Sequence, residues 1–201
     1  MYIHSLLSDY FPYCTHQGAD CSMVNAALIR QLTLKKRPLS IPTITSIIKE
    51  HLVFLQHGGA GGKWKTIHLK GIVVALYFGN EVTKGAQASF ELQQLPTGVH
   101  LKEIVLPFAN FCSSRIEQAN FQAADLSYSI FTDAAAEGTN FSEANLAYVD
   151  FTRANLENAD FREAHLVGAD FENCNLQGAD FRGAKLSGAR FPGAKLANVL
   201  I

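Results

Sequence analysis

The residues of this chain that most often carry out chemistry do not stand at the spacings that catalytic or metal sites require. None of the seven histidines lies four residues from another, so the sequence contains no His-Glu-x-x-His zinc helix. His51 is expected on a helix face and His165 in an outward position of a repeat. No nucleophile has a base beside it. The cysteines, which show neither zinc spacing nor a disulfide framework, are Cys14, Cys21, Cys112 and Cys174.

A glycine-rich segment between His57 and Trp64 invites comparison with a phosphate-binding loop, but three features exclude it. His57 replaces the first glycine of that motif, and Trp64 replaces the serine or threonine that binds magnesium. The residues that follow, 66–69, are typical of a strand and not of a helix whose N-terminus holds phosphate. We therefore predict a flexible loop.

Regularly spaced aspartates in the C-terminal half are the remaining candidates for catalytic carboxylates. Their even spacing places them on a solvated outer surface, and Arg153, Arg162 and Arg182 lie close enough in sequence to offset much of their charge. The aspartates are Asp150, Asp160, Asp170 and Asp180. The sequence therefore predicts no enzyme activity, no cofactor and no metal site.

These aspartates belong to a strict five-residue repeat that organises the chain from Ala109 to Ile201. A large apolar residue returns at every fifth position, and a small residue, mostly Ala, precedes it by two. A period of five matches neither the helix period nor the strand period. The repeated positions are Phe111, Ile116, Phe121, Leu126, Phe131, Ala136, Phe141, Leu146, Phe151, Leu156, Phe161, Leu166, Phe171, Leu176, Phe181, Leu186, Phe191, Leu196 and Ile201.

The alternation of Phe and Leu in this register predicts a coil with four sides of five residues each. Residues twenty apart would then stack at the interstrand spacing of about 4.8 Å. Phe111 and Phe131 would begin one internal column, and Phe121 and Phe141 the opposite one. Cys174 falls in a small inward position, so we expect a buried thiol there.

The repeat resembles the pentapeptide-repeat family, whose motif is a small residue, Asp or Asn, Leu or Phe, and two variable polar residues. The clearest matches are Ala144-Asn145-Leu146, Ala154-Asn155-Leu156, Ala159-Asp160-Phe161 and Ala179-Asp180-Phe181. The resemblance implies a mainly β fold, a right-handed quadrilateral β-helix, which we place at residues 99–201. The chain departs from the motif at Ala136, where we expect a thin spot, a bulge or a slight kink.

Residues 1–98 are expected to form a small α+β N-terminal module, which makes 1–98 and 99–201 the two predicted domains. The module would cover the N-terminal edge of the coil, which an open solenoid must protect. Its predicted elements are helices at 22–34 and after Pro42 and strands at 64–69, 72–78 and 88–95. On the second helix, the residues expected to face a core are Ile44, Ile47, Ile48, His51, Leu52 and Leu55.

Composition excludes several classes of protein. The formal net charge is −1, with ten basic and six acidic residues in 1–107 and seven basic and twelve acidic residues in 108–201. Neither half is charged enough to indicate binding to nucleic acid or to a membrane surface. The start of the chain shows no signal peptide, and no apolar run is long enough for a membrane span. We expect a cytoplasmic protein, or one secreted into a host cell without a cleaved signal.

The absence of catalytic features favours a non-enzymatic protein that binds a protein partner through the surface of the β-helix. Tyr128 and Tyr148 are predicted to stack on one face, with Ala147 and Val167 beside them and Ile130 and Val149 at the next corner. The alternative is that the tyrosines stiffen the coil or dock the N-terminal module. The domain layout is similar to that of some bacterial secreted effectors, although no motif in residues 1–107 supports this.

Two further hypotheses remain open. Some pentapeptide-repeat proteins mimic DNA and bind DNA gyrase, which protects it from quinolones, but this coil is short and weakly acidic. An enzyme site in the N-terminal module is the other. The end of the repeat lacks a polar cap, which indicates either an end-to-end homodimer or a longer natural protein. The residues of this possible dimer end are Leu196, Val199, Leu200 and Ile201.

Overall fold

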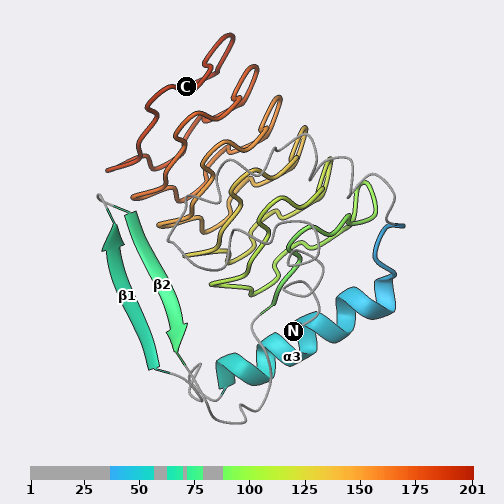
Figure 1. Ribbon diagram of the computed structural model, residues 1–201. Helices are drawn as coiled ribbons and strands as arrows, with labels where there is room; N and C mark the ends of the chain where they lie inside the picture. The colour runs from blue at the N-terminus through green and yellow to red at the C-terminus, as the bar shows by residue number, and fades with distance from the viewer. Residues whose placement is uncertain (1–36, 57–62, 70–71, 79–87) are drawn as a thin grey trace, which may run out of the picture. The chain divides into compact units, whose positions relative to one another are not determined.

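The computed structural model describes residues 37–56, 63–69, 72–78 and 88–201. Helix α3 (Ile41–Gln56) is followed by the antiparallel strands β1 (Lys63–Leu69) and β2 (Ile72–Phe78). From residue 88 onward, the chain winds into successive coils that stack in chain order (Figure 1). The predicted first helix and the glycine-rich loop lie outside the described residues.

The stacked coils form a four-sided β-solenoid. Parallel bridges join residues twenty apart from His100–Asn120 to Asp180–Leu200, and one bridge falls every five residues. Between bridges the chain turns, and the N–H three residues after each large apolar residue donates to its carbonyl, as Ala144 does to Phe141. The third residue of each such turn has a positive φ, which a type II turn requires. This confirms the four-sided solenoid, while its right-handed winding stays an implication of the resemblance.

The coil begins earlier than the five-residue register indicates. Its first bridge is Ser89–Asn110, whereas the register places its start near Val99. The Ser89–Asn110 and Gln94–Arg115 pairs are separated by 21 residues instead of 20, because one extra residue lies between Leu95 and Leu101. The strand predicted at 88–95 is therefore part of the first coil, and that prediction was wrong.

Two columns of phenylalanine fill the interior. Neighbouring rings within each column stack with centroids between 4.6 and 5.5 Å apart, and rings of opposite columns meet edge to face. Ala136 causes no bulge, because its N–H donates to Asn155 at 2.8 Å and Arg115, Ala135 and Asn155 keep the twenty-residue pairing. The expectation of a bulge was therefore wrong: the hydrogen bonds between coils hold the register where the side chain is small.

Hydroxyl and thiol side chains also occupy some of the small inward positions. Cys174 is fully buried, as predicted, and its Sγ donates to the carbonyl of Phe151 at 2.8 Å. Burial raises the pKa of this thiol to about 12, so it remains protonated. Thr139 donates in the same way to the carbonyl of Ile116. At these two positions the donor reaches an oxygen of the preceding coil, which avoids the cost of an unpaired buried polar group. Oγ of Ser114, in the same repeat position, has no hydrogen-bond partner among the described residues.

Helix α3 starts at a serine cap. The N–H of Thr43 donates to Oγ of Ser40, and Pro42 stands in the first turn, where its missing N–H costs nothing. The buried residues of the helix are Ile44, His51 and Phe54. Leu52 is 40% exposed, so its predicted core position was wrong and Phe54 takes that role. The second helix and both strands were predicted correctly, whereas the packing of an α+β module remains a prediction.

Candidate functional site

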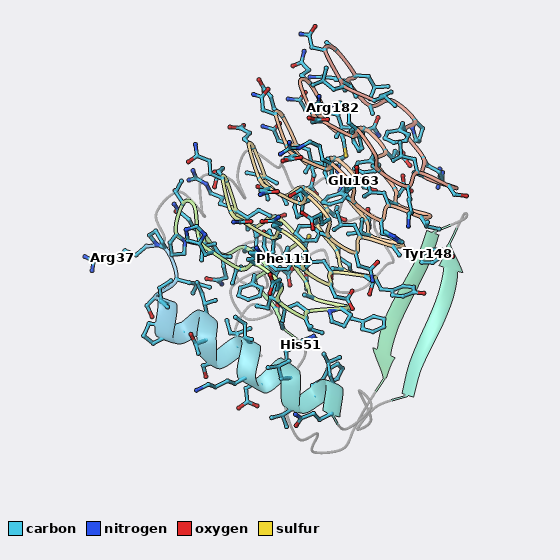
Figure 2. All side chains as sticks on the ribbon, turned by 180° about the vertical axis from the view of Figure 1, so that it is seen from behind. Arg37, His51, Phe111, Tyr148, Glu163 and Arg182 are labelled. Carbon is cyan, nitrogen blue, oxygen red and sulfur yellow. The ribbon has the colours of Figure 1, made fainter. Side chains whose placement is uncertain are left out.

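A column of three aromatic side chains runs along one outer corner of the coil. The rings of Phe108 and Tyr128 stack at 5.2 Å, and those of Tyr128 and Tyr148 stack at the same distance. Tyr128 is 39% exposed and Tyr148 is 43% exposed, and Figure 2 labels Tyr148 on the outside of the coil. The predicted stacking of the two tyrosines is confirmed. Their hydroxyl groups make no hydrogen bond to any other residue that the structure describes.

The backbone of this column is unfavourable for aromatic residues. Phe108, Tyr128 and Tyr148 have φ values of 64°, 59° and 57°, in the left-handed region that suits Gly or Asn. The next two members of the column, Gly168 and Gly188, have that conformation without steric cost. A non-glycine residue there costs about 1 kcal/mol or more, so the tyrosines are not placed where the backbone favours them.

Because Gly168 has no side chain, it leaves room for the ring of Tyr148. A Cβ atom on Gly168 would lie 2.6 Å from Cδ1 and Cε1 of Tyr148, whereas a Cβ on Gly188 would meet only Gly168 backbone atoms at 3.8 Å. The ring therefore lies directly over the Gly168 backbone. Any larger residue at 168 would displace the ring of Tyr148.

The other residues predicted for this surface divide into two groups. Ala147, Val167 and Ile130 are half-buried and flank the tyrosine column. Val149 is buried, because it occupies a small inward position two residues before Phe151. Its predicted place on the outer corner was wrong. We call Tyr128, Tyr148, Ala147, Val167 and Ile130 the tyrosine corner.

Gly168→Ala should destabilise the coil more than Gly188→Ala. Both place alanine at a positive φ, a backbone cost of about 1–2 kcal/mol, but only the first also collides with Tyr148. Urea unfolding would measure the difference, and in a Tyr148→Ala background the two substitutions should cost the same. Equal costs in the wild-type background would show that the ring does not rest on Gly168.

The repeat aspartates and asparagines cap turns, a role that sequence reasoning missed. Oδ1 of Asp150 accepts the N–H of Thr152 at 2.8 Å, and Asp170 does the same for Glu172 at 3.0 Å. Asn140 binds the N–H of Ser142 in the same way. Because Asn and Asp share this Asx-turn geometry, their interchange at one repeat position was the signal available in the sequence.

Ion pairs occupy several of the charged side chains of the coil. Arg162 binds Asp160 at 2.6 Å, and Arg182 binds Asp180 at 2.6 Å. The hydrogen bond from Arg182 lowers the pKa of Asp180. Burial raises the pKa of Asp170, and the nearby Arg190 opposes this effect. These carboxylates are thus occupied with turns and arginines. Asp150, Asp160 and Asp180 are partly exposed, whereas Asp170 is only 4% exposed, so its predicted place on a solvated face was wrong.

The chemistry-bearing residues do not converge elsewhere in the described residues. No group of three or more histidine, cysteine, aspartate or glutamate side chains in these ranges could hold a metal ion. His165 lies outward and its Nε2 is 2.7 Å from Nζ of Lys185, as the repeat predicts. No helix in the described part of the chain is long and apolar enough to cross a membrane.

The end of the coil exposes apolar residues. Leu196 is 50% exposed, Leu200 is 48% exposed and Ile201 is 89% exposed, while Val199 is half-buried. Contact between two copies through these residues stays a prediction.

The geometry of the coil agrees with comparisons to known sequences. The family described as Pentapeptide repeat region matches residues 105–181 and, in an overlapping match, 138–201. Residues 105–201 belong to the pentapeptide-repeat family. No curated protein matches the chain significantly.

Several solved pentapeptide-repeat structures are similar to this chain. A pentapeptide repeat protein of the cyanobacterium Cyanothece 51142 is 34% identical, over 49% of this chain and 65% of its own, with a TM-score of 0.42. One from the thylakoid lumen of Arabidopsis thaliana is 32% identical, over 48% and 63%, with a TM-score of 0.38. QnrB1, a plasmid-mediated fluoroquinolone resistance protein, is 22% identical, over 57% and 68%, with a TM-score of 0.43. The match thus spans under two thirds of the first two proteins.

Proposed function

We propose that this chain is a non-enzymatic interaction protein whose pentapeptide-repeat coil presents the tyrosine corner to a protein partner. The observation that carries this proposal is the exposed, stacked Tyr128–Tyr148 pair, held in a backbone conformation that suits glycine. Tyrosine is enriched in protein interfaces because its ring buries a large area and its hydroxyl finds a polar partner. The flanking apolar side chains of Ala147, Val167 and Ile130 extend this surface.

The structural alternative is that the tyrosines merely stiffen the coil. Each of the two stacked pairs, Phe108–Tyr128 and Tyr128–Tyr148, contributes about 0.5–1.5 kcal/mol, whereas each aromatic residue at positive φ costs about 1–3 kcal/mol. Stacking therefore does not exceed the backbone cost, so stability does not explain why tyrosine occupies both positions. This balance supports a role of the corner in binding.

Tyr128→Ala with Tyr148→Ala should abolish capture of the partner while leaving the coil folded. Because alanine keeps the positive φ, only the two ring stacks are lost, and the free energy of unfolding should fall by about 1–3 kcal/mol. The matched control is Arg162→Ala with Arg182→Ala, an exposed pair that also lies one coil apart on another side. Affinity capture would compare the three proteins, and urea unfolding would check their folds. A partner retained by the tyrosine variant as strongly as by wild type would exclude the tyrosine corner as its binding surface.

A role as a bacterial effector inside a host cell is a finer version of this proposal. It rests on the order of the chain, in which a helix and a β-hairpin precede the repeats. Capture from host-cell extract, in parallel with extract of the producing cells, tests it directly. Recovery of the same specific partner only from the producing cells would contradict it.

The charge of the coil does not favour a DNA mimic. B-DNA carries one charge per about 1.7 Å, whereas residues 108–201 have a net charge of −5. Asp160 and Asp180 are also neutralised by the arginines beside them. A partner that recognises the tyrosine corner fits these observations better than a gyrase that recognises an acidic rod.

A further inference from the structure

His51 lies on the buried face of α3, where the helix meets the beginning of the coil (Figure 2). Just before the helix, the N–H of Leu39 donates to the carbonyl of Gln94 at 2.8 Å. Ile44 shares one buried apolar cluster with Phe90 of the first coil. The His51 side chain itself is 0% exposed, so it is enclosed at this junction.

One hydrogen bond defines the protonation state of this histidine. Nδ1 of His51 accepts the N–H of Ala88 at 3.0 Å, and Ala88 in turn accepts the N–H of Asn110 in the next coil at 2.9 Å. Nδ1 must therefore carry a lone pair, which makes the ring neutral with its proton on Nε2. Nε2 has no hydrogen-bond partner of normal geometry among the described residues, although the backbone of Pro107 lies close enough to the ring to influence its pKa.

Protonation of Nδ1 would replace the hydrogen bond from Ala88 with a repulsive contact between two donors. A second ring proton, on Nδ1, would point at the N–H of Ala88, so that two donors would face each other in a fully buried site. The ring of Phe54 stacks on the imidazole at 5.6 Å and closes one side. Burial lowers the pKa of His51, and the Pro107 carbonyl opposes this effect.

In the part of the chain that the structure describes, no charged side chain is placed to stabilise a His51 imidazolium. The influences on the pKa of His51 include no charged side chain among the described residues. The titratable side chains on α3 other than His51 are exposed, and those of residues 88–107 are half-buried or exposed. The titratable side chains on these elements are Lys49, Glu50, Glu91, His100, Lys102 and Glu103.

We propose that His51 is an acid-sensitive latch that holds α3 on the first coil when neutral and releases it when protonated. In the unfolded or released state His51 titrates near its ordinary value of about 6.5, and in the docked state it titrates lower. The docked state is therefore fully stabilised above about pH 6.5 and loses that stability as the pH falls through the lower value. Release would uncover the apolar surface around Ile44 and Phe90, a response of the N-terminal edge that is separate from binding at the tyrosine corner.

Amide hydrogen exchange of the full chain tests the latch at pH 7.5 and pH 5.0, with rates corrected for the intrinsic effect of pH. The protection of the Ala88 amide and of the α3 amides should fall at least tenfold at pH 5.0, while that of Leu146 in the middle coils should not change. His51→Asn keeps an acceptor oxygen near the position of Nδ1 and does not titrate. Its protection at Ala88 should therefore be the same at both pH values.

Two results would overturn the latch. One is unchanged protection of Ala88 in the wild type at pH 5.0, and the other is an equal loss of protection in His51→Asn. The NMR titration of the His51 ring in the wild type provides a second measurement, which holds even if the variant folds poorly. A pKa at or above about 6.5 would contradict the proposal, because docking would then not oppose protonation.

Discussion

Leu166→Asp should unfold the pentapeptide-repeat coil. Leu166 is fully buried in the column that contains Leu146 and Leu186, and the substitution would place a carboxylate among apolar side chains. No lysine or arginine in residues 37–56 or 88–201 is buried, so no cation from these ranges lies inside the column to pair with it, and an unpaired buried charge costs several kcal/mol. We expect a loss of at least about 4 kcal/mol, which is most of the stability of a typical domain.

Leu196→Asp is the matched control for this substitution. Leu196 occupies an equivalent repeat position in the last coil but is 50% exposed, so its carboxylate would remain hydrated. We expect a loss below about 1 kcal/mol. Circular dichroism during thermal unfolding would compare both variants with wild type. Similar melting of Leu166→Asp and wild type would contradict the inward register.

Phe151→Ala should strongly destabilise the coil. Its ring packs on Phe131 at 5.1 Å with a tilt of 31° and stacks on Phe171 at 5.2 Å, and it meets Phe141 and Phe161 edge to face at 5.6 and 5.8 Å. Its loss leaves a cavity between coils that hydrogen bonds keep at a constant separation. Such truncations cost about 3–5 kcal/mol when the site cannot collapse.

Phe191→Ala provides the comparison for Phe151→Ala. Phe191 belongs to the same column but is only half-buried, and it contacts Phe171 at 4.9 Å and Phe181 at 6.1 Å. Because each coil contacts only its neighbours, the terminal loss should remain local, whereas the central loss should weaken both halves. Hydrogen exchange would show reduced protection on both sides of Phe151. Equal losses in the two variants would show that the interior collapses around the missing ring.

The sequence alone was sufficient to predict the solenoid, its four sides and its internal columns. A five-residue register depends only on which side chains point inward, and residues twenty apart must stack once the chain turns every five residues. The stacking of Tyr128 on Tyr148 followed from the same count. Such repeats are predictable because each coil contacts only its nearest neighbours.

Other features required the tertiary structure. The five-residue register did not predict the first coil, because a single extra residue before Leu101 changes the separation of paired residues from 20 to 21. Phe90 nevertheless stacks on Phe111 at 4.8 Å. Val149 showed that a medium-sized aliphatic residue can fill a position that usually holds alanine. Sequence patterns report the type of residue but not how much space its neighbours leave.

The environment of His51 is the clearest case of a property that only tertiary structure decides. The periodicity of α3 places His51 on the core face, yet the acceptor role of Nδ1 depends on Ala88, which lies 37 residues away in the first coil. Local spacing determines which side chains face inward, because it acts through the chain itself. Hydrogen bonds between distant segments depend on how those segments dock. The hydrogen bond from Ala88 to His51 therefore forms only when helix α3 and the coil are in contact.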